Sequence, residues 1–503
     1  MGVVQRQSLK QTIVTYAGIL LGGLATLLIF PLNLRAYGLL EWLLNTALVI
    51  VPFVSLGTTG LAVRFYPEFK DDESRHNGLL GLLLSIVTLS CLLFATLAYI
   101  FYTPFSEFVV EIISGTNKYA DAKYIPVLII FVTLYSYQQL LSQYTSNFLR
   151  IVVPKILDYL LPKIFKPLLF LLFFIGALSV MEMIYGMALV MLLIVFGLVL
   201  YLYRLQQWST RLNLKFLTGD RRKRLAVFAG YGTLGGTGHV LANRIDIVMV
   251  GALTSDMKLT GVYTVVTYLS EIIDAPRKAV NGITGPLAAR AWQQDDHVEV
   301  ERLYQKSSIN LLIIGSAIFG AIWLSTDALF KIMPDTQTMM QGKYIVLILG
   351  AAKLVDMMTG INNLVIGYSK YFRFNFYAVL VLAIFNVVCN LLFIPPFGIH
   401  GAALATFASI TGYNLIKFGY AWRVLHMQPF DWTTLKVLAI GLFCYAGAEL
   451  IPTTENIFID IPARSGGFVL LFGTLVFYLN LSEDLTSLAG KFFRNIKSKL
   501  LGR

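Results

Sequence analysis

Fourteen long apolar runs constrain the fold of this 503-residue chain more than any other feature of its sequence. A helix needs about 20 mostly apolar residues to cross a bilayer. The runs have approximate limits of 12–33, 42–63, 79–102, 125–148, 156–178, 183–203, 225–250, 260–282, 307–327, 344–367, 374–395, 399–422, 434–452 and 464–481. They predict an all-α, multi-pass membrane protein with about 14 transmembrane helices. The first run is long for a signal peptide and is expected to stay uncleaved.

The composition excludes several classes of protein. Apolar residues make up 57% of the chain and charged residues only 14%, against about 25% in soluble domains. This rules out a soluble enzyme, a nucleic-acid-binding domain and a disordered chain. The basic residues that give the chain its net charge of +12 lie between the apolar runs. They therefore indicate contacts with anionic lipid headgroups. The three cysteines, all within apolar runs, predict neither a disulfide framework nor a metal site, and no cofactor is expected.

The distribution of Lys and Arg predicts the orientation of the chain. With the N-terminus placed inside, the cytoplasmic segments carry 31 of the 40 basic residues and the outer segments carry 7. Basic residues concentrate in cytoplasmic loops of membrane proteins. Both termini are therefore expected in the cytoplasm.

The runs and loops predict five regions along the chain. They are an N-terminal six-helix lobe (1–204), a basic cytoplasmic linker (205–224), a C-terminal six-helix lobe (225–423), two additional transmembrane helices (424–482) and a cytoplasmic tail (483–503). In the tail, apolar residues recur every three or four positions with basic residues between them. That spacing is typical of an amphipathic helix at a membrane surface.

Two segments of the lobes resemble each other. Pro52 precedes an acidic pair by 20 residues, with Arg64 between them, and Pro276 precedes a second acidic pair by the same distance, with Arg290 between them. The offset of about 224 residues indicates an internal duplication. Because both lobes begin inside, the repeats are parallel. Transporters built from such repeats bind substrate between the halves and alternate access by rocking them.

The segment Gly230–Gly235 has the GxGxxG pattern of dinucleotide-binding sites. That site needs a preceding strand to aim backbone amides at a pyrophosphate, whereas this segment opens an apolar run. It therefore favours close helix packing or a helix bend. The sequence contains no Walker A, HExxH or GxSxG motif, and we expect a protein that is not an enzyme.

Ionisable residues within the runs are the strongest candidates for function, because each costs roughly 3 kcal/mol at a helix centre. They lie mainly in the second half of the chain: Arg244 and Asp246 in the seventh run, Glu271, Asp274 and Arg277 in the eighth, and Lys353 and Asp356 in the tenth. One interpretation is a set of salt bridges that holds the bundle together. The other is a proton or sodium relay, favoured by the excess of acids.

The first half instead carries a polar cluster in the fourth run, formed by Gln138, Gln139, Ser142, Gln143 and Asn147. Its helical spacing is compatible with a cavity lining or with a hydrogen-bonded seam between helices. Asn362 in the tenth run is a further candidate for a cavity lining. Arg64 and Arg277 lie near cytoplasmic ends of runs, where they either bind a pyrophosphate or only hold the loop inside.

The layout resembles the multidrug/oligosaccharidyl-lipid/polysaccharide exporter superfamily, and within it the bacterial polysaccharide (O-antigen, Wzx-type) flippases. Four segments carry the resemblance, which extends over nearly the whole chain: 55–64, 243–246, 261–263 and 394–406. It implies a V-shaped two-lobe bundle with a central cationic cavity in a bacterial plasma membrane. The implied substrate is a polyprenyl-pyrophosphate-linked oligosaccharide, the repeat unit of an O-antigen, capsule or exopolysaccharide, moved from the inner to the outer leaflet.

The resemblance also implies roles for residues. Headgroup binding would fall on Arg64, Arg244, Arg277 and Lys353, and ion coupling on Asp246, Glu271, Asp274 and Asp356. Gln139, Gln143, Asn147 and Asn362 would line the cavity. The implied partners are the lipid-linked oligosaccharide, membrane lipids and a polysaccharide polymerase machinery, without nucleic acid.

Four alternatives remain at this point. A cation-coupled multidrug exporter of the same fold would use the acids, although such exporters usually have twelve spans. A lipid II flippase, by contrast, has fourteen spans, as this chain is predicted to have. A membrane-embedded glycosyltransferase or polymerase would need catalytic acids on a large outer loop, and the longest outer loops here, near 104–124 and 328–343, are short. A scaffold without transport is the fourth, and the charges within the runs argue against it.

Overall fold

The chain is predominantly helical in the part that its computed structural model describes, which is residues 3–71, 76–101, 124–148, 150, 152–454 and 456–487, with side chains from residue 14 onward except that of His239. Among these residues there is no β-strand. Several helices are long and apolar enough to cross a bilayer. The protein is therefore an all-helical, multi-pass membrane protein, as predicted. The described residues end at Ser487, so the rest of the predicted amphipathic tail (483–503) lies outside them.

The number of spans can be followed helix by helix. Within the described ranges seven helices pass a test of length and apolarity, and an eighth passes if α15 (Lys343–Met358) and α16 (Asn362–Tyr368), bent by 42°, count as one span. Two of the predicted spans, 374–395 and 399–422, lie in α17 (Arg373–Tyr420), on either side of a break at Gly398. Two more lie in α11 (Gly219–Thr254) and α12 (Met257–Gln293), whose sequences include the charged residues discussed above. The total of fourteen and the cytoplasmic termini stay predictions.

The chain divides into two compact units, residues 1–264 and 265–503. The first unit therefore includes α11 and the first two turns of α12, which the sequence-based division assigns to the C-terminal lobe. The predicted boundaries at 204 and 224 follow the loops, whereas this division follows the packing. Each unit is described by itself below.

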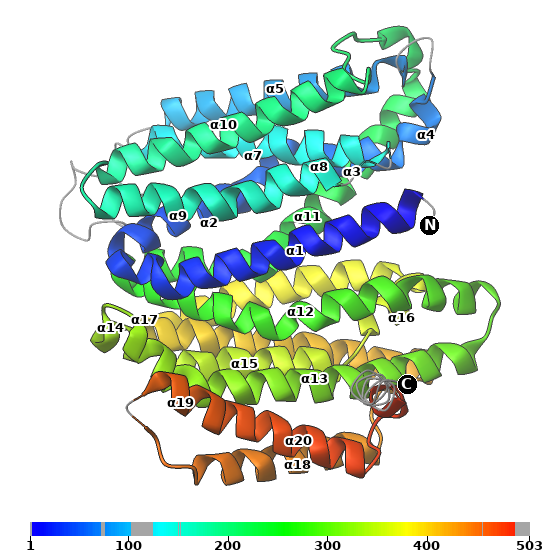
Figure 1. Ribbon diagram of the computed structural model, residues 1–503. Coiled ribbons are helices and arrows are strands. Elements are labelled where there is room, and N and C mark those ends of the chain that lie inside the picture. The colour runs from blue at the N-terminus through cyan, green and yellow to red at the C-terminus, as the bar shows by residue number, and fades with distance from the viewer. Residues whose placement is uncertain are drawn as a thin grey trace, which may run out of the picture. The chain divides into compact units, whose positions relative to one another are not determined.

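The first unit is built around α2 (Leu34–Ser55), which packs against α7 (Ile125–Ser146) and α11. Figure 1 shows the long helices of this unit running alongside one another. The other helices are α1 (Val3–Leu28), α3 (Thr58–Arg64), α4 (Tyr66–Phe69), α5 (Leu79–Ile100), α8 (Val152–Lys155), α9 (Leu161–Phe174) and α10 (Val180–Arg204). A π-helical turn, η4 (Ile156–Leu160), joins α8 to α9. Short 3₁₀ segments lie at Phe30–Asn33, His76–Gly78 and Leu214–Phe216.

Glycines let α2 approach its neighbours closely. A Cβ atom on Gly38 would lie 1.8 Å from the carbonyl oxygen of Met257, and one on Gly261 would lie 2.2 Å from that of Leu34. One turn further along α2, the Trp42 indole donates a hydrogen bond to the Val248 carbonyl at 3.1 Å. Small residues that allow backbone contact are typical of helix interfaces in membranes.

The GxGxxG segment lies inside α11, a continuous helix, so its glycines form no phosphate-binding turn. Gly232 faces the break between α2 and α3, where a Cβ atom would be 3.6 Å from the Cα of Gly57. Gly57 itself has a φ of 67°, and a Cβ there would be 2.6 Å from the Ala229 carbonyl. The pattern thus permits close helix packing, as predicted.

The second unit is centred on α13 (His297–Ile332), which packs against α15, α18 (Trp432–Glu449) and α20 (Gly467–Tyr478). Short elements complete the unit: α14 (Thr336–Met340), α19 (Ile457–Ile461), and π-helical turns η6 (Ala421–Leu425) and η7 (Pro462–Gly466). Helix α17 packs on α15. It breaks at Gly398, with φ 55° and ψ −134°, two residues after the pair Pro395 and Pro396. Glycine tolerates this conformation and proline cannot complete the preceding hydrogen bonds.

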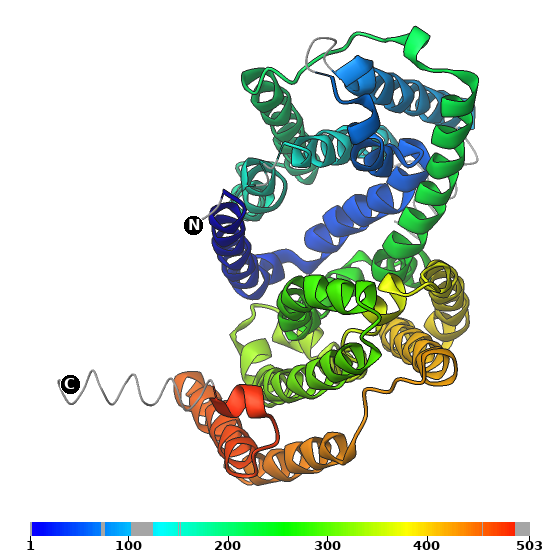
Figure 2. The ribbon, with the colours of Figure 1, turned by 90° about the vertical axis from the view of Figure 1, so that its right-hand side faces the viewer.

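The last two predicted spans, α18 and α20, form an antiparallel pair on α13. Figure 2 shows them, orange to red, at one edge of the second unit. Phe468 and Phe472 are almost fully buried in the cluster that joins the three helices. The other faces of the pair are apolar and open: Leu442 is 70% and Leu470 is 72% exposed. Apolar surface of this extent is costly in water, and lipid chains are the solvent that suits it.

Candidate functional site

A polar cavity of about 290 Å³ lies within the first unit. Its wall comes from α2, α3, α7 and η4, and most of it from one face of α7. The lining residues are Leu48, Thr59, Tyr135, Gln138, Gln139, Ser142, Gln143 and Asp158. Two of the four predicted cavity-lining residues, Gln139 and Gln143, are therefore in its wall. A cavity with this polarity in an apolar bundle is a candidate site for polar ligand groups.

Asp158 organises one side of this cavity. Its carboxylate accepts hydrogen bonds from the Ser142 hydroxyl and from Gln138 Nε2, the latter at 3.2 Å. Lys155, one turn earlier, interacts with Asp158 electrostatically. Sequence reasoning did not single out Asp158, because it lies in the run already interrupted by basic residues and proline. The available signal was its position four residues from both Pro154 and Pro162, because proline interrupts regular helix geometry.

The Gln138 side chain is buried, and its Oε1 atom has no hydrogen-bond partner among the described residues. Because only the amide nitrogen can donate to Asp158, the unpartnered atom is an acceptor. An unsatisfied buried acceptor costs about 1–3 kcal/mol. A ligand hydroxyl or a water molecule would remove that cost.

A buried ion pair in the first unit corrects the expectation that the first half lacks ionisable residues within spans. Lys166 pairs with Glu41, whose side chain is only 11% exposed. Asn45 donates to Glu41 Oε2 at 3.2 Å, and Arg244 Nη1 approaches Asn45 Oδ1 at 3.5 Å. The pair was missed because Glu41 precedes the second predicted run by one residue, and because Lys166 was interpreted as an interruption of the fifth.

Arg244 and Asp246, both on α11, have different partners, as their spacing of two residues predicts. Asp246 is buried and accepts a hydrogen bond from the Tyr263 hydroxyl at 2.9 Å. Arg244 contacts the neutral amide of Asn45. The structure therefore does not bring these two predicted site residues together as an ion pair.

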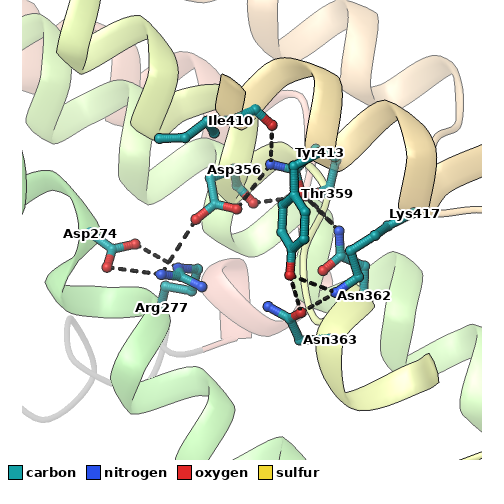
Figure 3. A network of polar contacts seen from close by, with 10 residues as sticks. Asp274, Arg277, Asp356, Thr359, Asn362, Asn363, Ile410, Tyr413 and Lys417 are labelled. Carbon is teal, nitrogen blue, oxygen red and sulfur yellow. Dashed lines mark hydrogen bonds and ion pairs between the residues drawn. The ribbon is translucent and has the colours of Figure 1, made fainter. Parts of the chain in front are cut away.

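The second unit contains a network that joins three predicted site residues (Figure 3). Arg277 makes a two-pronged contact with Asp274, at 2.5 and 3.0 Å, from the same helix. Its Nη2 atom also lies 3.3 Å from Asp356 Oδ2 on α15. The guanidinium group bridges two carboxylates, which is the geometry that arginine favours. This pairing, rather than the Lys353–Asp356 pairing that the i, i+3 spacing allows, is what the structure contains.

Asn414 on α17 extends this network. Its Nδ2 donates to Asp356 Oδ1 at 3.0 Å, and its Oδ1 accepts from Thr359 at 2.8 Å and from Asn362 at 2.9 Å. Asn362, predicted to line a cavity, is thus a buried member of a helix-to-helix seam in this structure. Sequence reasoning missed Asn414, since asparagines are common and only its place inside an apolar run was a signal.

Lys417, one turn beyond Asn414, is fully buried. Its Nζ atom donates to Asn363 Oδ1 and to the Tyr413 hydroxyl, the latter at 3.3 Å. A buried ammonium group without a carboxylate in contact is costly. When all are ionised, Lys417 and Arg277 balance the formal charges of Asp274 and Asp356, and Lys417 interacts electrostatically with Asp356.

The other predicted site residues have separate surroundings. Arg64 is exposed at the end of α3, and Glu271 is half-buried on α12 without an ion pair to any described residue. Lys353 is half-buried and interacts electrostatically with Asp356, but it forms no ion pair within 4 Å in the described parts of the chain. Asn147 donates to the Ala62 carbonyl at 2.8 Å and so fastens α7 to α3.

Comparison with known proteins relates this fold to transporters. No protein-family model matches the chain. The probable flippase AglR of Haloferax volcanii is 22% identical over 276 residues, which cover 52% of this chain and 57% of that protein. The chain thus spans little more than half the length of this relative.

Solved structures match far more of the chain. The lipid II flippase MurJ, in an inward closed conformation, superposes with a TM-score of 0.71 at 14% identity, covering 94% of this chain and 99% of MurJ. An inward-facing multidrug resistance MATE family transporter of the MOP superfamily gives 0.60 at 11% identity, covering 82% and 93%. The chain therefore has the fold of these transporters.

Proposed function

We propose that the protein is a flippase that moves a polyprenyl-pyrophosphate-linked oligosaccharide from the inner to the outer leaflet by alternating access. The sequence relative that is a probable flippase and the fold likeness to the lipid II flippase support the class. The substrate itself rests on the sequence resemblance to polysaccharide flippases. A bacterial plasma membrane, cytoplasmic termini and a polymerase as partner belong to the same proposal.

One observation carries the choice of a flippase over a drug exporter. The likeness to the lipid II flippase covers 94% of this chain, whereas the likeness to the multidrug transporter covers 82%. The chain ends in the helix pair α18–α20, which packs on α13 through a well-formed apolar cluster. This pair supplies the two spans that the chain is predicted to have beyond the twelve that such exporters usually have.

The physics of the substrate explains why such a bundle needs buried polar groups. A sugar headgroup cannot cross hydrocarbon alone, because each unpaired polar group costs several kcal/mol. Each unit of this protein holds polar groups inside an apolar bundle, at the cavity in the first and at the Arg277 network in the second. Such groups let the headgroup pass through protein while the polyprenyl chain stays in lipid.

The structure favours a division of roles among the basic residues. Arg277 already forms ion pairs with two carboxylates, so we assign it to ion coupling rather than to binding of the pyrophosphate. Arg64 is exposed, Arg244 approaches the neutral amide of Asn45, and Lys353 has no ion pair among the described residues. We propose each of them separately as a candidate for contact with phosphate oxygens, since charge-assisted contacts suit these oxygens.

We assign ion coupling to the carboxylates. Asp274 and Asp356 share one arginine, so protonation of either, or a sodium ion beside them, would change how tightly α12 is held to α15. Glu271 on α12 and Asp246 on α11 are the further candidates. Buried ionisable groups of this kind are typical of proton and ion pathways in transporters.

The experiment is headgroup exchange in liposomes. Purified protein is reconstituted with a fluorescent polyprenyl-pyrophosphate oligosaccharide, and an external quencher is added with and without a proton or sodium gradient. We expect protein-dependent loss of the protected fraction, and a loss of gradient sensitivity in Asp356→Asn. An absence of exchange by well-folded protein would contradict the proposal.

Two other functions of the same fold are tested in parallel arms. A cation-coupled drug exporter is favoured by the carboxylates in the bundle, and it would move a cationic dye in response to a gradient without exchanging the lipid. A lipid II flippase is favoured by the TM-score of 0.71 to MurJ, and it would exchange fluorescent lipid II in preference to the polysaccharide precursor.

A further inference from the structure

The cavity of the first unit has the chemistry of a site for a neutral, hydroxyl-rich ligand. A carboxylate, three glutamine amides, two hydroxyls of serine and threonine and a tyrosine line it, and no lysine or arginine is among the lining residues. A pyrophosphate would meet only the negative charge of Asp158 here. Hydroxyl groups both donate and accept, which matches a wall of mixed amides and carboxylate.

The side chain of Gln138 independently indicates that a hydrogen-bond partner is missing at this cavity. The side chain is 8% exposed, and its Nε2 atom is engaged with Asp158 at 3.2 Å. Its Oε1 atom lacks a hydrogen-bond partner among the described residues. Buried acceptors in folded proteins are almost always paired. This acceptor is shielded in the present conformation, so a donor from a ligand reaches it when the amide shifts toward the cavity that Gln138 lines.

Asp158 presents further acceptor capacity beside it. A carboxylate has about four lone-pair directions, and two of them are taken by Ser142 and Gln138. Two acceptors on neighbouring side chains can therefore receive two hydroxyls of one ring, and the Tyr135 ring supplies an aromatic face. The volume of about 290 Å³ is at the lower end of ligand pockets, roughly 300–1,000 Å³. It exceeds what a bare cation needs and suits a single sugar ring.

We propose that this cavity binds one neutral sugar residue of the lipid-linked oligosaccharide, with Gln138 Oε1 and Asp158 accepting its hydroxyls and Gln139 and Gln143 donating to them. The inference rests on the proposed function and adds to it the place where the sugar residue binds. The sugar is recognised inside the first unit by neutral and acidic groups, while the pyrophosphate is bound by basic residues elsewhere.

The transport test compares two lipids that differ only in the sugar. Exchange is measured for polyprenyl pyrophosphate carrying a neutral oligosaccharide and for bare polyprenyl pyrophosphate. We expect Gln138→Leu to raise the half-saturating concentration of the glycosylated lipid about tenfold and to leave that of the bare lipid unchanged. Gln341→Leu, the same change at an exposed position in the second unit, should alter neither. An equal effect of Gln138→Leu on both lipids would overturn the inference.

A binding test separates this inference from the proposed function. Saturation-transfer NMR is recorded for methyl glycosides of glucose, galactose and N-acetylglucosamine with the full-length protein in nanodiscs. We expect transfer with the wild type and its loss in Asp158→Asn, and in Gln138→Leu that elutes as a folded monodisperse species. No transfer with the wild type, or undiminished transfer with both variants, overturns the sugar site. Transfer without lipid exchange would support the site and contradict the flippase instead.

Discussion

The close contact between α2 and the start of α12 gives the sharpest prediction, because backbone atoms face each other there. In Gly38→Ala the new Cβ atom would lie 1.8 Å from the Met257 carbonyl oxygen and 2.6 Å from the Gly261 nitrogen. Ordinary contact begins at 3.4 Å, so the helices must separate locally by about 1.6 Å. Neither neighbour is a flexible side chain that could turn away.

The expected cost follows from what the separation breaks. Inserting a methyl group into a packed interface costs typically about 1–3 kcal/mol. The Trp42 indole would also move away from the Val248 carbonyl, now at 3.1 Å, and an unpaired buried donor adds about 1–3 kcal/mol. We expect a total loss of about 2–6 kcal/mol. At about 2–4 °C per kcal/mol for a large domain, the melting temperature should fall by roughly 4–24 °C.

The assay is thermal unfolding of purified protein in detergent, followed by tryptophan fluorescence. Gly236→Ala is the matched control: it lies in the interior of α11, and a Cβ there would meet nothing within 4 Å. We expect this control to be at least as stable as the wild type, because alanine is favoured over glycine in helices by about 1 kcal/mol. If Gly38→Ala melts with the control, the close approach of α2 to α12 is refuted.

Three further changes test the buried contacts of each unit by the same thermal unfolding. Lys166→Met should cost about 3–5 kcal/mol, because it leaves the Glu41 carboxylate buried without its cation; adding Glu41→Gln should restore at least half, and additive losses would argue against the pair. Arg277→Met should cost a similar amount, since it leaves two carboxylates close together, and a loss below 1 kcal/mol would contradict the network. Phe468→Ala should cost about 3–5 kcal/mol through the cavity it leaves, whereas Leu470→Ala on the exposed face of the same helix should cost less than 1; equal losses would contradict the assigned faces.

The sequence predicted the helical elements better than their contacts. Apolar runs determine where a helix can cross a membrane, so the positions of α5, α7 and α10 follow directly from them. The break in α17 was likewise predictable, because two prolines precede a glycine between the eleventh and twelfth runs. The packing-based division at residue 264 could not be predicted, because a sequence shows where loops lie but not which helices pack together.

The candidate sites show the same limit. Charges inside the runs identified Asp274, Arg277 and Asp356, which the structure brings into one network. The i, i+3 spacing of Lys353 and Asp356 allowed a pair within one helix, whereas the arginine that pairs with Asp356 lies on another helix, which spacing cannot show. Asp158 was missed for a related reason: it gains its surroundings from α7, which sequence periodicity cannot place beside it.

The assignment of α11 to the first unit has a consequence for how the chain is made. The close contacts of α2 involve Val248, Met257 and Gly261, which the ribosome adds more than 200 residues after the α2 residues that they contact. Until these residues have been synthesised, the Trp42 indole and Gly38 lack the partners that they have in the folded first unit. The first unit is therefore finished late, after the basic linker has already been translated, and a ribosome that stalls in that linker would leave α2 without the α11 and α12 residues that it contacts.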